Sequence, residues 1–169
     1  MENNLTLAEM EELLAIHEMA EFNVDIDATM ATLVDNPIYE LPALGWRIEG
    51  QEAVRETYKR LLHGGDVYNL WADKRVHATS STSLAREAYV YIDTPEGRVT
   101  GQYFVAMDFA GDKIAGERMY MDTTFAKAMN DILGPDFGDI PGVTRLEDTV
   151  PAPRPRLDRA AQHAADSNH

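Results

Sequence analysis

Acidic and imidazole side chains are the groups in this sequence that could move protons during a reaction. Glu87 lies in a segment of alternating polarity. A carboxylate enclosed by apolar side chains has its pKa raised toward neutrality, where it can act as a general base or acid. The alternative is an ordinary strand carboxylate in water, because a register shift of one residue moves a side chain to the opposite face. His17 lies on the apolar stripe of a predicted helix, where its imidazole could belong to the core, to the rim of a pocket or to a ligand contact. We expect His77 to be exposed near the end of a strand.

Asp122 stands directly before a predicted helix and has two interpretations. Asp in that position is a common N-cap, whose side chain accepts hydrogen bonds from the free backbone amides of Thr124 or Phe125. The same carboxylate could instead transfer protons at the junction between a strand and a helix. The cap is the simpler interpretation because it requires nothing else of the structure.

The sequence does not indicate a metal or a cofactor. It contains no Cys and no HxH or HExxH pattern, so no set of converging metal ligands is visible. Asp25 and Asp27 are better explained as charges at a helix end. Gly64 and Gly65 follow a predicted helix, whereas a phosphate-binding loop precedes one. We therefore expect no bound metal and no cofactor.

Charge and composition favour a soluble cytoplasmic protein. The 169 residues carry a net charge of −14, and the first 46 hold ten acidic and no basic side chains, so nucleic acid is not an expected partner. No stretch approaches the roughly 18 apolar residues of a membrane span, and the acidic N-terminus does not resemble an export signal. The absence of Cys suits a reducing compartment.

The pattern of the chain predicts helices first and a sheet afterwards. A capping box at Thr6 and Glu9 begins a helix to about residue 22, and Asp27 is the expected N-cap of a short second helix that Pro37 ends. We expect residues 38–41 to be extended and 45–50 to form a loop. Further helices are predicted over 52–62 and 122–133, and strands over 67–79, 84–94, 98–109 and 113–121. The four strands form an antiparallel meander, and the helices must cover one of its faces.

The domain organisation is one folded unit with a tail. Residues 1–134 form the domain, and residues 135–169 form a tail that holds five of the eight prolines. Phe137, Ile140 and Val143 are the tail residues that could still dock on the body or on a neighbouring subunit.

The order of elements resembles the SnoaL-like, or polyketide cyclase-like, branch of the NTF2-like superfamily from about Leu7 to Leu133. The segments that carry the resemblance are DIDATMATLVDNPIYELP (25–42), GWRIEGQEAVRETYKRLL (45–62) and GDKIAGERMYMDTTF (111–125). The resemblance implies an α+β cone-shaped barrel, in which a curved antiparallel sheet packs with three to four helices around a deep apolar pocket. Relatives include cyclases, isomerases, dehydratases and an epoxide hydrolase beside non-catalytic pocket proteins, so the fold does not select a reaction.

Alignment with the limonene epoxide hydrolases implies that their Asp-Arg-Asp set is missing. The arginine of that set falls on Glu87, and its two aspartates fall on Tyr89 and Met119. The tyrosine and asparagine of the first strand fall on Tyr39 and Leu41. The same alignment predicts an inward face of Tyr39, Leu41, Glu87, Tyr89, Tyr91, Tyr103, Met107, Glu117, Met119 and Met121.

Two functions remain open at this point. The first is a cofactor-independent isomerase, dehydratase or aldol-cyclase acting on a small hydrophobic carbonyl compound. The alternative is a non-catalytic protein that binds an apolar metabolite. For the enzyme we expect Glu87, Tyr89, Tyr39 and Asp122 to be catalytic, the last because polyketide cyclases have an acid/base Asp near this junction. The expected ligand contacts are Leu41, Tyr91, Tyr103, Met107, Glu117, Met119, Met121 and His17.

The resemblance also implies a homodimer, since many relatives associate through the outer face of the sheet. On the predicted register that face would carry an apolar patch that no helix covers. The residues expected there are Arg86, Ala88, Val90, Ile92, Phe104 and Ala106.

Overall fold

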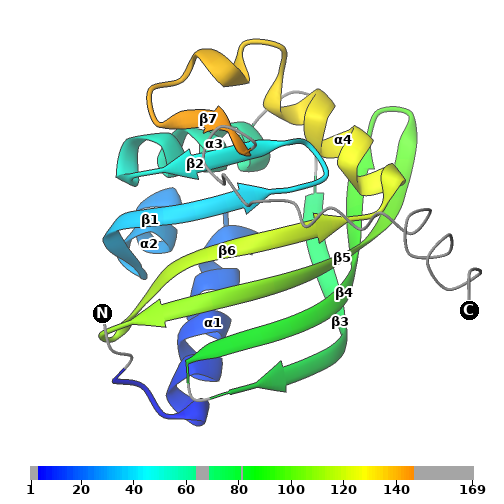
Figure 1. Cartoon of the computed structure of the whole chain (residues 1–169). Coiled ribbons are helices and arrows are strands. Elements are labelled where there is room, and N and C mark those ends of the chain that lie inside the picture. The colour runs from blue at the N-terminus through cyan, green and yellow to red at the C-terminus, as the bar shows by residue number, and fades with distance from the viewer. Residues whose placement is uncertain (1–3, 64–68, 81, 147–169) are drawn as a thin grey trace, which may run out of the picture.

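The computed structural model describes residues 4–63, 69–80 and 82–146. The helices in these ranges are α1 (Leu7–Phe22), α2 (Ile26–Ala31), α3 (Gln51–His63), α4 (Thr123–Leu133) and a short 3₁₀ helix, η1 (Phe137–Asp139). The strands are β1 (Leu33–Leu41), β2 (Trp46–Glu49), β3 (Asn69–Thr79), β4 (Ser83–Thr94), β5 (Gly97–Ala110), β6 (Lys113–Met121) and β7 (Val143–Arg145). The predicted α+β class is confirmed (Figure 1). No helix within the described ranges is long and apolar enough to cross a bilayer.

One curved, unclosed sheet organises the molecule. Its strand order is β3-β4-β5-β6-β1-β2-β7, and the predicted antiparallel meander of β3 to β6 is confirmed. β1 joins β6 in parallel, and β2 and β7 extend the sheet in antiparallel pairs. Figure 1 shows α1, α2 and α3 behind the sheet, with α4 following the end of β6 and lying near the start of β5. The helices therefore cover the face on which a cavity can form.

Two helix starts follow the chemistry of their caps. The Thr6 side chain accepts from the Glu9 amide while the Glu9 carboxylate accepts from the Thr6 amide, which confirms the capping box. The prediction that Asp27 caps α2 is wrong, because Asp25 accepts from the Ala28 amide at 3.0 Å. Asp27 instead lies in the first helical turn and pairs with Arg55.

The sheet extends further toward the N-terminus than predicted. Pro37 lies within β1, at the point where the pairing of β1 with β6 shifts register, so the missing amide is tolerated. The expected loop at 45–50 contains β2, a strand of four residues. Gly45 and Gly50 flank it with φ angles of +71° and +94°. These two glycines are turn signals on either side of a very short strand, so the sequence pattern predicted a loop.

The first residues of the expected tail pack on the body. Phe137 is 1% exposed and meets the Trp46 ring edge-on at 5.8 Å between centroids. Val143 pairs with Ile48 across β7 and β2, and Arg60 forms an ion pair with Asp136. The folded body thus continues past residue 134 to at least residue 146, and residues 147–169 of the expected tail lie outside the described ranges.

The two faces of the sheet differ from the prediction in one respect. Arg86, Ala88, Val90 and Ile92, which were expected on the outer face, are buried. Phe104 and Tyr120, exposed by 44% and 49%, are adjacent large side chains on the outer face. Phe104 was expected on this face and is exposed there, whereas Tyr120 was not part of the expected patch. The homodimer stays a prediction.

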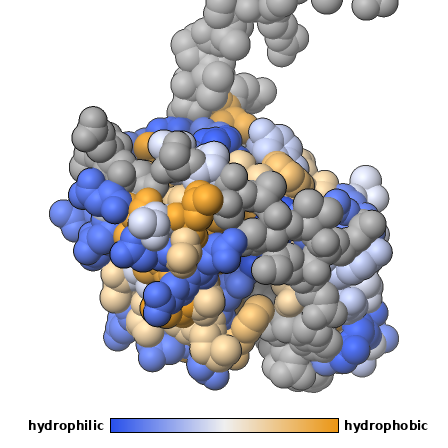
Figure 2. All heavy atoms as spheres, turned by 90° about the horizontal axis from the view of Figure 1, so that it is seen from below, coloured by the Kyte–Doolittle hydropathy of each residue, from blue (hydrophilic) through white to orange (hydrophobic). Residues whose placement is uncertain are grey.

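Apolar side chains are also exposed along α1 and just beyond it. Figure 2, which views the molecule from below, shows apolar groups among charged ones on the face where α1 lies. The exposed members are Leu7, Ile16, Met19, Phe22 and Val24.

Candidate functional site

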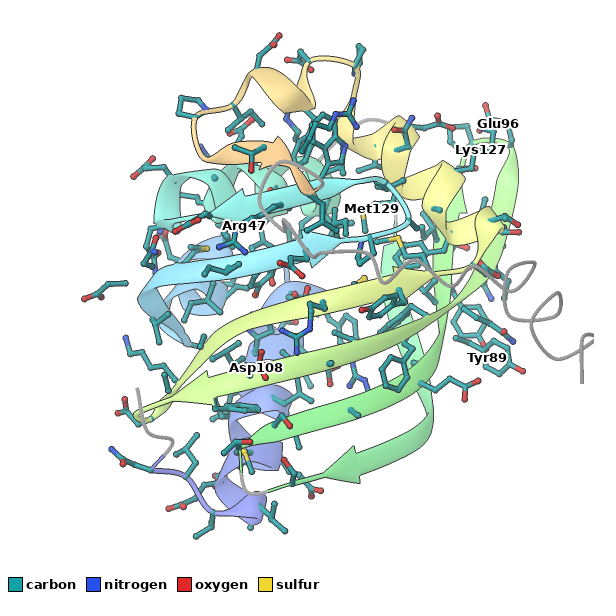
Figure 3. All side chains as sticks on the ribbon, viewed as in Figure 1. Arg47, Tyr89, Glu96, Asp108, Lys127 and Met129 are labelled. Atoms are coloured by element: carbon teal, nitrogen blue, oxygen red, sulfur yellow. The ribbon has the colours of Figure 1, made fainter. Side chains whose placement is uncertain are left out.

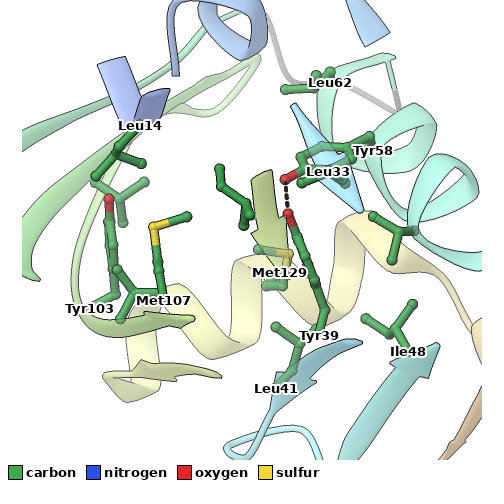
Figure 4. Packing of buried hydrophobic residues seen from close by; sticks show 14 of the residues in the cluster. Leu14, Leu33, Tyr39, Leu41, Ile48, Tyr58, Leu62, Tyr103, Met107 and Met129 are labelled. Carbon is green, nitrogen blue, oxygen red and sulfur yellow. Dashed lines mark hydrogen bonds between the residues drawn. The ribbon is translucent and has the colours of Figure 1, made fainter. Parts of the chain in front are cut away.

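A cavity of about 90 Å³ lies between the inner face of the sheet and helices α1, α3 and α4. A single water needs roughly 10–15 Å³, so the space suits a small organic molecule or several waters. Seven of the twelve predicted site residues line it: His17, Tyr39, Leu41, Tyr103, Met107, Glu117 and Met119. In the close view of Figure 4, Tyr103 and Met107 lie on one side and Tyr39 on the other.

The prediction that Glu87, Tyr89 and Tyr91 face the cavity is wrong. Burial alternates along β4 with Arg86 and Ala88 on the buried face, so the three predicted residues lie on the opposite face. Figure 3 shows Tyr89 projecting to the outside of the ribbon. The reason is a one-residue error in register, which exchanges the two faces of a strand.

This correction also changes the comparison with the hydrolase set. An arginine, Arg86, does line the cavity. The next inward position along β4 is Ala88, so the carboxylate expected two residues after the arginine is absent. The complete Asp-Arg-Asp set is therefore still missing, with Arg86 and Ala88 at the inward positions of β4 in place of Glu87 and Tyr89.

Asp122 and Met121 do not line the cavity. The Asp122 carboxylate accepts from the Phe125 amide at 2.7 Å and is the N-cap of α4, which is the simpler of its two interpretations. Met121 is half-buried and packs against the hydrophobic core beside the cavity. The side chain of His77 lies outside the described residues.

A glycine brings β6 close enough to β1 to place two of the polar groups together. A Cβ on Gly116 would lie 1.9 Å from the Ile38 carbonyl oxygen, so no larger residue fits this approach. The resulting parallel register pairs Tyr39 with Glu117. A tyrosine from β1 and a carboxylate from β6 therefore enter the cavity side by side.

Glu117 is the carboxylate with unusual properties. It is half-buried and lines the cavity, and no hydrogen bond or ion pair of it occurs within the described ranges. Burial raises its pKa to about 7, assisted by the charge of Glu21 and opposed by His17 and Arg86. Near neutral pH the group therefore exists in both protonation states.

His17 is buried and fully engaged at both ring nitrogens. Nδ1 lies 2.6 Å from Thr32 Oγ1, and Nε2 lies 3.0 Å from Tyr58 Oη and 3.2 Å from Glu21 Oε1. Burial alone would lower the pKa of His17, but the charge and hydrogen bond of Glu21, with charge from Glu117, outweigh it and raise the pKa. The imidazole thus binds a proton more readily than its burial suggests.

Two tyrosines continue the chain of hydrogen bonds from His17. Tyr58 Oη lies 2.9 Å from Tyr39 Oη, as the dashed line in Figure 4 marks. Burial raises the pKa of both phenols well above the usual value, so both remain neutral hydroxyl groups. A neutral phenol can donate or accept, and the pair connects His17 to the cavity.

A second charged group closes the opposite side of the cavity. Arg86 forms an ion pair with Glu18, and its Nη2 donates to Tyr103 Oη at 2.8 Å. Arg86 is buried, with 8% of the residue exposed. It neutralises Glu18, and Glu21 lies beside His17, so among the described acidic groups that line the cavity Glu117 is the one with no ion-pair partner.

The polar cluster contains residues that sequence reasoning missed. Glu21 stands four residues after His17, a spacing that places both on one face of a helix. That spacing could have identified the pair. Glu18 follows His17 on α1, but its partner Arg86 lies on β4, and Thr32 and Tyr58 meet His17 from the end of α2 and from α3, so no local pattern connects these contacts.

Comparison with known proteins identifies the fold. No family model and no curated protein sequence matches the chain. Among solved structures it is similar to an LEH-like epoxide hydrolase of Mycobacterium tuberculosis, with 19% identity over 72% of this chain and 89% of that one and a TM-score of 0.61. A candidate polyketide cyclase of Xanthomonas campestris matches at 17% identity over 73% and 98% of the two chains, with a TM-score of 0.61. An NTF2-like protein of Anabaena variabilis matches at 15% identity over 70% and 90%, with the same TM-score.

Proposed function

We propose, for this chain with its NTF2-like fold, that it is a cofactor-independent acid/base enzyme acting on a small hydrophobic carbonyl compound. The observation that carries the proposal is Glu117, an unpaired carboxylate with a pKa of about 7 in a largely apolar cavity. A general base works best when its pKa lies near the pH of the reaction. Two similar structures, an epoxide hydrolase and a candidate polyketide cyclase, are compatible with small-molecule chemistry in this fold.

The proposed reaction begins with proton transfer from carbon to Glu117. The ionised carboxylate removes a proton from the carbon next to the carbonyl. The electron pair of that C–H bond forms a carbon–carbon double bond, and the π pair of the carbonyl moves to its oxygen to give an enolate. A hydroxyl hydrogen bond from Tyr39, which stands beside Glu117 in the register of β1 and β6, would stabilise this oxygen. Protonated Glu117 then returns the proton to the same or another carbon. Return to another carbon completes an isomerisation.

The alternative is a non-catalytic binding protein. Most polar groups of the cavity are already hydrogen-bonded to one another, as in the chain from His17 to Tyr39, and the remaining walls are mostly apolar. Such a cavity could hold a ligand without changing it. The two proposals differ in whether a bound carbonyl compound exchanges its protons.

Proton exchange in D₂O tests the proposal without knowledge of the natural substrate. Cyclopentanone and cyclohexanone fit a small apolar cavity and carry exchangeable hydrogens beside the carbonyl. We expect the protein to accelerate the replacement of these hydrogens by deuterium, followed as the loss of their ¹H NMR signals. Binding of both ketones without accelerated exchange would contradict the enzyme and support the binding protein.

A further inference from the structure

The hydrogen bonds around His17 determine where its protons lie. Thr32 Oγ1 is 2.6 Å from the carbonyl oxygen of Thr29, and a carbonyl cannot donate, so the single hydroxyl proton of Thr32 points there. Thr32 Oγ1 can then only accept from His17 Nδ1, which lies 2.6 Å away. Nδ1 therefore carries a proton in both charge states of the imidazole, and Nε2 is the nitrogen that titrates.

We propose that Thr32 holds His17 in the Nδ1–H tautomer, and that protonation of Nε2 reverses the hydrogen bonds of Tyr58 and Tyr39, turning Tyr39 into a donor for a ligand oxygen. Thr32 is a positioning residue in this proposal, since it acts through His17. The ligand class follows from it: an uncharged molecule with an acceptor oxygen, such as a ketone. The inference concerns binding, and it extends the proposed function by naming what prepares the oxygen site.

With neutral His17, the direction of each hydrogen bond is set. The lone pair of Nε2 accepts from the Tyr58 hydroxyl at 3.0 Å. Because the only hydroxyl proton of Tyr58 is donated to His17, the Tyr58 oxygen accepts a hydrogen bond from the Tyr39 hydroxyl, 2.9 Å away. Tyr39 then offers only lone pairs to the cavity, so its hydroxyl cannot donate to a carbonyl oxygen.

With protonated His17, the chain can run the other way. Nε2–H donates toward Glu21 and Tyr58, so the Tyr58 proton is free to be donated to Tyr39 Oη. The Tyr39 proton is released toward the cavity, where it can bind a ligand oxygen. A change of charge at His17 thus decides whether the Tyr39 hydroxyl donates or only accepts hydrogen bonds in the cavity.

The groups that face His17 favour the protonated state. Glu21 and Glu18 lie on its own helix, Glu117 comes from β6, and Arg86 comes from β4 as the opposing cation. Tyr58 and Thr32 are neutral partners from α3 and from the end of α2. The acidic groups raise the pKa of His17 above its ordinary value, so Tyr39 acts as a donor while His17 is protonated and loses this capacity as the pH rises through that pKa.

Nitrogen NMR tests the tautomer directly. In ¹⁵N-labelled protein, we expect His17 above its titration midpoint to carry its proton on Nδ1, assigned by loss of the signals in His17→Gln. Thr32→Val removes the hydroxyl and should abolish this preference, whereas Thr32→Ser keeps the hydroxyl and should restore it. A neutral His17 protonated on Nε2 in the unsubstituted protein would overturn the proposal, even if Thr32→Val fails to fold.

Paired ligands test the reversal. Cyclohexanone has an acceptor oxygen, and methylenecyclohexane has the same shape without it. In a Glu117→Gln background, which removes the titration of that carboxylate, we expect the Kd of the ketone to rise roughly three- to tenfold across the titration of His17, the value of one hydrogen bond. The Kd of the hydrocarbon should stay constant, and Thr32→Val should remove the difference.

The outcome of these binding experiments is independent of whether the protein catalyses proton exchange. A ketone whose Kd does not follow the titration of His17 overturns the reversal, whatever the exchange experiment gives. A protein that shows the tautomer and the pH-dependent Kd but no proton exchange keeps this inference and loses the proposed catalysis.

Discussion

Glu117→Gln should lower the rate of ketone proton exchange by about a hundredfold or more, the usual contribution of a general base. Glutamine keeps the size of the side chain and cannot accept the proton. The ketone should still bind, because the apolar walls and Tyr39 are unchanged. The measurement is the initial rate of deuterium incorporation at saturating ketone, compared with the Kd from a separate titration.

The matched control is Glu87→Gln, the same chemical change on the other face of the sheet. Glu87 was the base expected from the sequence, and the structure places it outside the cavity. Its replacement should leave the exchange rate within a factor of two. A large loss with Glu87→Gln and none with Glu117→Gln would reverse the assignment of the base.

Arg86→Met should lower the free energy of unfolding by about 3 kcal/mol, the lower end of the range for breaking a buried ion pair. Its side chain is 10% exposed and that of Glu18 is 20% exposed, so the remaining carboxylate would be poorly solvated. Tyr103 would also lose the donor to its hydroxyl oxygen. Urea unfolding followed by circular dichroism measures the change.

Arg98→Met provides the control for Arg86. Arg98 pairs with Asp93 at 2.8 Å, but its side chain is 53% exposed, so we expect a loss below about 1 kcal/mol. The double variant Glu18→Gln with Arg86→Met should recover part of the stability, because no unpaired charge remains. Equal losses for Arg86→Met and Arg98→Met would show that burial of the pair contributes nothing.

Most helices and long strands of this fold could be predicted from the sequence, because the patterns that indicate them involve residues close together in the chain. The capping box at Thr6, the helix cap at Asp122 and the turns between the meander strands each depend on a few neighbouring residues. Short strands are less readable. β2 has only four residues, and β7 has three, so both depend on pairing partners from elsewhere in the chain.

The register of β4 could not be decided from its sequence, because both faces of the strand mix charged and apolar side chains. The buried face carries Arg86 with Val90, and the opposite face carries Glu87 with Tyr89. Alternation of polarity therefore gives no preferred face. Burial of an arginine here depends on Glu18, a residue 68 positions earlier on α1.

Part of the cavity was nevertheless predictable. His17 and Glu117 were expected to contact a ligand and Tyr39 to be catalytic, and all three line the cavity. Their combined chemistry was not predictable, because the partners Thr32 and Tyr58 meet His17 only through the packing of helices. The properties of a buried group follow from such distant neighbours.

Titration of the Glu117 carboxyl group tests the central claim most directly. The ¹³C shift of its side-chain carboxyl, assigned by its absence in Glu117→Gln, should change with a midpoint near pH 7, because burial disfavours the charged form. Glu87 should be measured in the same spectra as an internal comparison. A Glu117 midpoint near pH 4.5, the ordinary value for this side chain, would contradict its role as the acid/base group of the cavity.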